Sequence, residues 1–327
     1  MPNDNGFVLL TGTANLKLAK DIGQILGRTV HETVSVFADG EKRIFIPENL
    51  RKRDVFIIQP TCPPVDSNLM ELLLMIDASR RASVSEITVV IPYFGYSRQD
   101  RKDRSRVPVS AALVADLIEH AGVDRILTVD IHSEQEPGFV KIPWDNLYSS
   151  YSLLPELKKH FNPDNLVVAS PDKGGVLKAT FYADLLDAQG LAIVFKERDV
   201  HKKNESKALD LIGNVKDKDV LLVDDMIDTA GTIFEAARLI KERGAKSISV
   251  AATHGLFSDP APQKITDSPL EKIFITDSVP IREEMLKDHR ITVISVAKLL
   301  AEAINCVYNG YSISEKLIPK TQKGAGS

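Results

Sequence analysis

Residues 220–234 place acidic and small polar side chains directly after an apolar run. The segment reads VLLVDDMIDTAGTIF, so a strand pattern leads into Asp224 and Asp225, and a helix pattern follows the next turn. That turn consists of Asp228, Thr229, Ala230, Gly231 and Thr232. Hydroxyls and backbone N–H groups at the start of a helix suit a phosphate monoester. The acidic pair suits a ligand that presents hydroxyl donors or carries a divalent cation, and a sugar phosphate satisfies both conditions.

An ordinary helix N-cap is the structural alternative for this turn, because Asp and Thr are common capping residues. A lone Asp-Thr pair would favour that interpretation. The apolar strand, the acidic pair and the Thr-Ala-Gly-Thr turn together favour a ligand site. Ligands of open α/β sheets bind in the crevice at the carboxyl ends of the strands. Gly231 would also allow the backbone to approach a bound group closely.

A second segment whose side chains could bind a substrate is strongly basic. Ser97–Arg106, SRQDRKDRSR, contains four arginines and one lysine among two aspartates. A solvated charged loop is the commoner meaning of such a run. This run follows the strand pattern 86–92 and the aromatic stretch 93–96, so we expect it at the carboxyl end of a strand. Arginine binds polyphosphate in a bidentate manner, and Gln99 can contact an adenine edge or a phosphate oxygen.

Three further groups have an ordinary structural explanation when each is taken alone. The sequence FADGE, Phe37–Glu41, predicts a hairpin turn whose Asp-Gly pair supplies the positive φ. Lys196-Glu197-Arg198 is typical of a charged surface turn. A lone histidine at a strand end, such as His132, is usually structural. It follows Asp130 by two residues, however, and on an extended chain the two side chains share a face and can bind one ion.

The elements that would position these groups alternate between strand and helix patterns, which predicts an α/β fold. Strands are expected at 6–11, 54–59, 86–92, 125–130, 165–169, 191–195, 219–223, 247–252, 271–276 and 291–295. Several of them are nearly continuous Val, Ile and Leu, as strands covered on both faces should be. Helices are expected at 66–80, 110–121, 174–188, 232–243 and 296–307. Asp66 is placed to cap the first helix, and Gly122 and Gly244 stand where helices should end. The alternation predicts mostly parallel sheets flanked by helices.

This series of strands and helices occurs twice, so we expect two similar domains. A length of 327 residues suits two domains of roughly 150 residues each. The first series ends at Asp130 and the second begins near Asn165, which places the junction within 143–165. The predicted domains are 1–148 and 149–327. A C-terminal segment of about 305–316 is a candidate to pack back on the first domain.

The composition excludes several classes of protein. The chain has 41 Lys and Arg against 45 Asp and Glu, a net charge of −4, which gives no overall attraction for nucleic acid. No apolar run approaches the roughly 18–20 residues that span a bilayer, and no secretory signal is recognisable. Cys62 and Cys306 form neither a CxxC motif nor a disulfide framework. We expect a cytoplasmic enzyme or binding protein without a nucleic-acid or membrane partner.

The segment 220–234 resembles the fingerprint of the type I phosphoribosyltransferase fold. Nearly the whole chain, from about Thr11 to about Ser314, resembles the ribose-phosphate pyrophosphokinase (phosphoribosyl diphosphate synthetase) family. The strings that carry this resemblance include FADGE at 37–41, YSRQDRKDRSRVPVSA at 96–111, DIHSEQEPGF at 130–139, SPDKGG at 170–175, KER at 196–198 and THGLFS at 253–258. The family transfers the β,γ-diphosphoryl group of MgATP to the C1 hydroxyl of ribose 5-phosphate and thereby feeds nucleotide biosynthesis.

The resemblance implies a role for each segment. Asp224 and Asp225 would bind the ribose hydroxyls, and the turn 228–232 would bind the 5-phosphate. Lys196 and Arg198 would be the catalytic cations that close over the bound ATP. The implied ATP-binding residues are Phe37, Asp39, Glu41, Arg98, Gln99, Asp103 and His132. The implied Mg²⁺-linked residues are Asp130, His132 and Asp172.

The resemblance also implies an assembly and its regulation. The turn 37–41 would reach into the nucleotide site of a neighbouring subunit, in hexamers built from dimers. Members of the commonest class are activated by phosphate and inhibited by ADP. Here Asn49 stands where a phosphate-binding serine is usual, although Arg51, Ser312 and Ser314 resemble their counterparts.

Two other functions are compatible with parts of the sequence. A phosphoribosyltransferase, which consumes the diphosphate product, would share the segment 224–232 but would lack the duplicated domains and the elements around Arg98 and Lys196. A non-catalytic regulatory homologue should have lost Lys196, Arg198 or the acidic pair, whereas this chain keeps all of them. Release of AMP from ATP and ribose 5-phosphate would distinguish the three.

Overall fold

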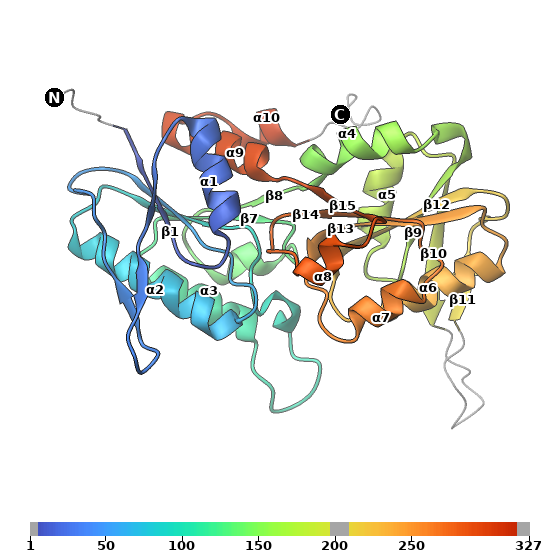
Figure 1. Ribbon diagram of the computed structural model, residues 1–327, viewed down its shortest axis with the longest axis horizontal. Coiled ribbons are helices and arrows are strands. Elements are labelled where there is room, and N and C mark those ends of the chain that lie inside the picture. Colours follow the sequence, from blue (N-terminus) through green and yellow to red (C-terminus); the bar gives the residue numbers. More distant parts are fainter. Residues whose placement is uncertain (1–5, 197–208, 319–327) are drawn as a thin grey trace. The chain divides into compact units, whose positions relative to one another are not determined.

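Every strand predicted from the sequence forms in the computed structural model, which describes residues 6–196 and 209–318. The strands belong to two α/β units (Figure 1). Unit 1 contains the chain up to Ser149, together with Ser278–Pro280 and Ser295–Ile318. Unit 2 takes Ser150–Asp277 and Ile281–Ile294. Each unit has a mostly parallel sheet, so the predicted fold class is confirmed.

The sheet of unit 1 has the strand order β2-β1-β5-β6-β7-β8, and all its neighbouring strands are parallel. Its strands are β1 (Val8–Thr11), β2 (Val30–Glu32), β5 (Val55–Ile58), β6 (Ile87–Ile91), β7 (Arg125–Val129) and β8 (Trp144–Leu147). The central strands β5 and β6 are buried along their whole length, as continuous Val and Ile runs require. A separate antiparallel hairpin pairs β3 (Val34–Val36) with β4 (Lys42–Ile44).

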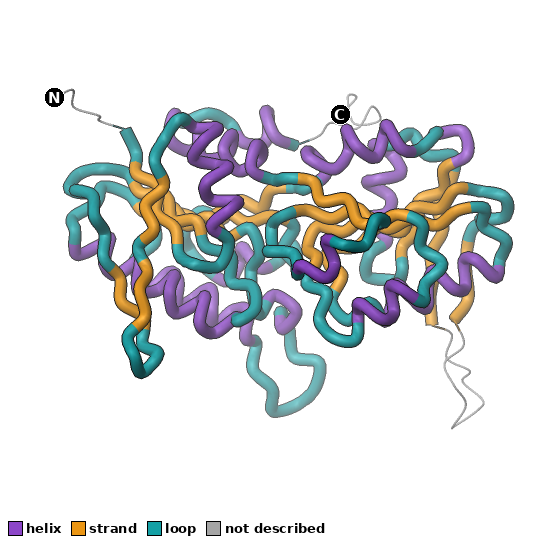
Figure 2. The backbone as a smooth tube through the Cα atoms, in the orientation of Figure 1, coloured by secondary structure: helices purple, strands orange, loops and turns teal. Residues whose placement is uncertain are grey.

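Helices cover both faces of this sheet (Figure 2). The helices α2 (Val65–Arg81) and α3 (Ser110–Ala121) contribute apolar side chains to its main core. The helix α1 (Leu16–Leu26) contacts α9 (Ala297–Asn309), which is followed by α10 (Ile313–Leu317). The rings of Phe7 and Tyr308 meet edge to face at 4.8 Å. The end of the described chain therefore packs within unit 1.

Unit 2 has the strand order β11-β10-β9-β12-β13-β14-β15, in which only β10 and β11 pair antiparallel among the described strands. Its strands are β9 (Leu166–Ser170), β10 (Gly190–Lys196), β11 (Leu209–Ile212), β12 (Asp219–Ile227), β13 (Ser247–Gly255), β14 (Lys272–Thr276) and β15 (Ile291–Ile294). One apolar cluster packs α4 (Ser150–His160) and α5 (Val176–Leu185) on one face. In a second apolar cluster, side chains of α6 (Gly231–Glu242) and α7 (Ala261–Thr266) pack against side chains of the sheet. The short helix α8 (Glu283–Leu286) follows β14.

Several predicted boundaries are wrong, each for a local reason. Asp66 does not cap α2, because the helix begins at Val65 and Pro64 occupies the cap position. The expected helix 174–188 is shorter and spans only Val176–Leu185. Gly122, with φ of 105°, and Gly244, with φ of 88°, do end their helices in the left-handed region, as predicted.

Two expectations about the chain as a whole can also be compared with the structure. Cys62 and Cys306 are both buried and free, which confirms that the sequence contains no disulfide framework. Within residues 6–196 and 209–318, no helix has the length and apolar character that crossing a membrane requires.

Candidate functional site

The basic segment Ser97–Arg106 begins in a tightly built turn after β6. Gly95 donates its backbone N–H to Thr61 Oγ1 at 2.7 Å, and a Cβ at Gly95 would lie only 2.4 Å from the Thr61 carbonyl oxygen. Only glycine fits there. Tyr96 adopts a left-handed φ of 67°, and its hydroxyl donates to the Asp66 carboxylate. The chain then enters the 3₁₀ turn η1 (Ser97–Gln99).

The predicted nucleotide-binding side chains of this segment lie at the surface of unit 1. Arg98, Gln99 and Asp103 are all exposed. The Gln99 side-chain oxygen accepts a hydrogen bond from Ser110 Oγ at 2.7 Å, which connects η1 to the first residue of α3. The segment therefore leaves β6 at its carboxyl end and presents cations to solvent, as the sequence predicts.

The neighbouring strand β7 brings Asp130 and His132 to the same edge of the sheet. The extended chain expected between them is wrong: β7 ends at Val129, and Asp130 takes a left-handed φ of 41°. Asp130 is 8% exposed as a residue, and its carboxylate accepts the Ser149 N–H at 3.1 Å. His132 is exposed, and its backbone N–H donates to Ser97 Oγ at 3.0 Å. The end of β7 is thus connected directly to η1.

The FADGE sequence forms the predicted hairpin turn between β3 and β4. Phe37 N–H donates to the Glu41 carbonyl at 2.9 Å, and Gly40 has φ of 94°. The Asp39 carboxylate accepts the Glu41 N–H at 3.1 Å. The Phe37 ring is 49% exposed, with the Arg43 guanidinium 5.8 Å from its centroid. An aromatic face and carboxylates are therefore available at the tip of this hairpin.

In unit 2, the acidic pair lies inside β12 rather than beyond its end. The strand was expected to stop at residue 223, but it continues to Ile227 because Asp224 and Met226 still pair with β13. Asp225 is 8% exposed and donates its N–H to Asp224 Oδ1 at 2.8 Å. Burial and the neighbouring Asp225 charge raise the pKa of Asp224 well above its ordinary value. Hydroxyl donors or a cation would stabilise the charged pair.

The turn Asp228–Thr232 connects β12 to α6. Ala230 holds a left-handed φ of 56° at the N-cap position, and no side chain caps the helix. Thr229 and Thr232 are exposed. A Cβ on Gly231 would lie 3.2 Å from Lys264 Nζ, so an ammonium group stands beside this turn. Uncapped N–H groups, hydroxyls and a cation at one helix start are suited to an anion.

The loop after β9 holds the predicted metal-linked Asp172. Its Oδ1 accepts the N–H groups of Gly174 and Gly175 at 2.8 and 3.1 Å, so this carboxylate already organises the start of α5. A Cβ at Gly175 would lie 2.7 Å from Ser170 Oγ. The ammonium of Lys173 lies 5.7 Å from the centre of the Phe195 ring on β10. That contact brings this loop next to the end of β10.

The two predicted catalytic cations are described only in part. Lys196 is the last residue of β10, and its backbone pairs with Leu209 of the antiparallel neighbour β11. Arg198 lies outside the described residues.

Apart from Phe37, Asp39 and Glu41 at the tip of the β3–β4 hairpin, the described site residues of each unit thus lie at or near the carboxyl ends of parallel strands. Unit 1 brings together η1 and the end of β7, and unit 2 brings together β12, the Asp228–Thr232 turn and the loop of Asp172. The described residues contain no group of three or more His, Cys, Asp or Glu side chains arranged to hold a metal ion.

Sequence reasoning missed two polar contacts that support these residues. Glu136 contacts Ser97, and Lys42 contacts Glu71. The partners are distant in sequence and no spacing rule connects them, so neither could be found before the strands were assembled.

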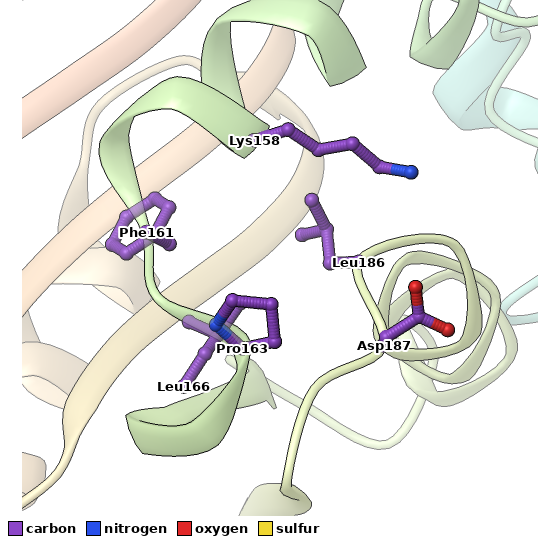
Figure 3. A pocket seen from close by; sticks show the side chains of 6 residues that line it. All are labelled: Lys158, Phe161, Pro163, Leu166, Leu186 and Asp187. Carbon is purple, nitrogen blue, oxygen red and sulfur yellow. The ribbon is translucent and has the colours of Figure 1, made fainter.

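The pocket drawn in Figure 3 has a different location and contains none of the predicted site residues. It measures about 220 Å³ and is lined by Lys158, Phe161, Pro163, Leu166, Leu186 and Asp187. Leu166 is the first residue of β9, whereas Asp172 follows its last residue. The pocket is therefore at the amino end of that strand, where open α/β sheets do not usually bind substrates.

Comparison with known proteins covers most of the chain. A family model described as the N-terminal domain of ribose phosphate pyrophosphokinase matches residues 7–122. A model described as a phosphoribosyl synthetase-associated domain matches residues 195–317.

Individual relatives are similar over nearly their whole length. The ribose-phosphate pyrophosphokinase of Wolinella succinogenes is 46% identical over 314 residues, 96% of this chain and 99% of the relative. That of Campylobacter jejuni is 45% identical over 315 residues, with the same coverage. The crystal structure of phosphoribosylpyrophosphate synthetase from Mycobacterium smegmatis matches with a TM-score of 0.88 at 39% identity, covering 93% of this chain and 99% of its own.

Proposed function

The chain belongs to the ribose-phosphate pyrophosphokinase family, and on that premise we propose that unit 2 binds ribose 5-phosphate and unit 1 binds ATP. The reaction transfers the β,γ-diphosphoryl group of ATP to the C1 hydroxyl of D-ribose 5-phosphate. The products are 5-phospho-α-D-ribose 1-diphosphate and AMP. The enzyme is a transferase of nucleotide biosynthesis.

The observation that carries this assignment is the acidic pair beside the uncapped start of α6. Burial and the neighbouring charge of Asp225 raise the pKa of Asp224, and hydrogen-bond donors or a cation beside the pair would favour its charged form. The 2- and 3-hydroxyls of the ribose would donate to Asp224 and Asp225. The 5-phosphate would accept from the N–H groups and hydroxyls of the Asp228–Thr232 turn, where the helix dipole favours an anion.

ATP would be bound by the exposed groups of unit 1. The Arg98 guanidinium can donate two hydrogen bonds to the triphosphate. Gln99 and Asp103 belong to the same segment as Arg98, and the His132 N–H connects to that segment through Ser97. In the assembled enzyme, Phe37 of a neighbouring subunit would stack on the adenine, and Asp39 and Glu41 would accept from its amino group. This sharing of one site between two subunits requires a homo-oligomer, and we propose the hexamer built from dimers that the family resemblance implies.

The residues present fit Mg²⁺ as the cofactor. Mg²⁺ in such sites binds one or two carboxylates and completes its shell with phosphate oxygens and water, so it does not require three protein ligands. Asp130 and Asp172 would supply carboxylate oxygens to the ion, and His132 would contact the phosphate groups of ATP. When bound, the ion neutralises charge on the triphosphate.

The transfer step needs positioning and charge stabilisation more than covalent help from the protein. The ribose C1 oxygen attacks the β-phosphorus in line, the bond from that phosphorus to the bridging oxygen breaks with the oxygen leaving on AMP, and the hydroxyl proton passes to water. Lys196 and Arg198 would stabilise the charge that develops on the transferred group and on AMP. Lys196 is the last residue of β10, and Arg198 comes two residues later in the sequence.

Two finer properties complete the proposal. The protein would act in the cytoplasm, and its response to phosphate would be weaker than is usual, because Asn49 occupies the position of a phosphate-binding serine. The Asn49 side chain already accepts the Arg51 N–H at 3.1 Å. Rates measured with and without inorganic phosphate would test this point, and a strong activation would contradict it.

A coupled assay of AMP release tests the function itself. The purified chain is incubated with ATP, ribose 5-phosphate and Mg²⁺, and each component is omitted in turn. We expect AMP only when all three are present. A chain that instead consumed 5-phosphoribosyl diphosphate with a nucleobase would be a phosphoribosyltransferase, and a chain inactive in both assays would be a regulatory homologue.

A further inference from the structure

Glu136 is a carboxylic acid inside unit 1 that the proposed reaction does not use. It begins the 3₁₀ turn η2 (Glu136–Phe139) and has no exposed surface. Its Oε1 accepts a hydrogen bond from Ser97 Oγ. Its Oε2 is buried and has no hydrogen-bond partner in the described part of the chain.

Ser97 connects this acid to the nucleotide-binding segment. Its side chain is almost completely buried, at 4% exposure of the residue, so solvent cannot replace its partners. Its Oγ donates to Glu136 and accepts the His132 N–H at 3.0 Å. One hydroxyl therefore joins η1, the chain after β7 and η2. Glu136, Ser97 and the His132 amide together are called the serine bridge below.

Holding a carboxyl group in this place is costly. Burial raises the pKa of Glu136 to about 7, against weaker opposing effects of Ser97, the Ser133 backbone and His132, while Asp100 raises it further. An apolar side chain would fill the same space without that cost. Only a polar group, however, gives Ser97 a directional partner and so fixes the rotation of its hydroxyl.

We propose that Ser97 and Glu136 are positioning residues for ATP, which hold Arg98 and Gln99 in a fixed relation to His132. Arg98 follows Ser97 directly, and Gln99 receives its own support from Ser110 on the other side of η1. The inference rests on the proposed function, because it requires this edge of unit 1 to bind the nucleotide.

The serine bridge would act on nucleotide affinity. Without it, η1 and the chain at His132 would be ordered only when ATP binds, and the lost conformational freedom would weaken binding. The acidic pair and the Asp228–Thr232 turn belong to unit 2 and share no residue with the bridge. Affinity for ribose 5-phosphate should therefore not change.

Ser97→Ala tests the proposal by steady-state kinetics. The substitution removes both hydrogen bonds of the Ser97 hydroxyl. The KM for ATP should rise at least about fivefold, the factor that corresponds to about 1 kcal/mol for a single hydrogen bond, with the KM for ribose 5-phosphate unchanged. Glu136→Gln keeps an acceptor oxygen for Ser97, so it should retain a KM for ATP close to that of the parent enzyme. Glu136→Leu removes the acceptor and should behave as Ser97→Ala does.

Ser79→Ala is the matched control. Ser79 is also fully buried in unit 1 and donates to the Met75 carbonyl at 2.8 Å, but it lies within α2. It should lower the melting temperature without changing either KM. An unchanged KM for ATP in Ser97→Ala, or equal rises in both KM values, would overturn the positioning role. Absence of AMP release by the parent enzyme would instead overturn the proposed function.

Discussion

Lys42 of β4 and Glu71 of α2 form an ion pair, in which Nζ lies 2.9 Å from Oε1. The Glu71 side chain has no exposed surface and that of Lys42 is 20% exposed. The same carboxylate accepts from the N–H and hydroxyl of Thr13 at 2.9 Å and from Gln59 Nε2 at 3.0 Å. Lys42 directly follows Glu41, the last residue of the FADGE turn. The ion pair therefore anchors one strand of the exposed hairpin to the core of unit 1.

Glu71→Ala should consequently destabilise the protein strongly. The substitution leaves the Lys42 ammonium and the Gln59 amide without their buried acceptor, and breaking such a pair costs about 3–5 kcal/mol. Denaturant unfolding measures the change. The control is Lys17→Ala, which removes an exposed pair with Asp21 at 2.8 Å and should cost at most about 1 kcal/mol. Equal effects of the two substitutions would show that the ion pair of Lys42 and Glu71 does not anchor the fold.

Asp225→Asn should weaken binding of ribose 5-phosphate more than binding of ATP. An amide accepts through one oxygen only and carries no charge, and a hydrogen bond to a charged group contributes about 1.5–3 kcal/mol. The KM for ribose 5-phosphate should therefore rise roughly 10- to 100-fold, measured at saturating ATP. Asp217→Asn, an exposed residue before the same strand, is the control. Equal rises in both KM values would contradict the ribose assignment.

The sequence predicts the central strands well because each is an almost uninterrupted apolar run. It does not predict β2, β4 or β8, whose sequences VHE, KRI and WDNL contain no such run. The residues 143–165, expected to be a junction, contain β8 and α4. These elements form through pairing and packing with distant segments, which local patterns cannot reveal.

The site residues are predictable from their types, but their geometry is not. Asp224 and Asp225 extend β12 because the neighbouring strand supplies pairing partners beyond the apolar run. The left-handed turn at Asp130 depends on the Ser149 amide, which is distant in sequence. The ion pair of Lys42 and Glu71 likewise appears only when the hairpin packs against α2.

Lys196→Ala should lower kcat by orders of magnitude while binding of ribose 5-phosphate stays nearly intact. The expected reason is that a cation acting on charge in the transition state contributes to kcat rather than to substrate affinity. Kinetics at saturating substrates measure kcat, and equilibrium binding of ribose 5-phosphate measures affinity. Lys216→Ala removes an exposed lysine elsewhere in unit 2 and should leave both values unchanged. An unaltered kcat in Lys196→Ala would remove this lysine from the mechanism.

Glu136 should make the stability of the protein fall as the pH rises from about 4.5 to about 7. Burial raises its pKa from 4.5 to about 7, so between these values the folded chain holds a proton that the unfolded chain has lost. Unfolding then releases the proton, and the free energy of unfolding decreases with pH until both states are ionised.

Glu136→Gln removes this titration and leaves a neutral group at every pH. At about 1.4 kcal/mol per pKa unit, the stability of the variant relative to the parent should increase by up to about 3 kcal/mol between pH 5 and pH 8. Urea midpoints at several pH values across this interval measure the difference. Glu134→Gln, which changes an exposed carboxylate two residues earlier, should give a curve parallel to that of the parent. A parallel curve for Glu136→Gln as well would mean that this buried acid ionises without cost, contrary to its surroundings.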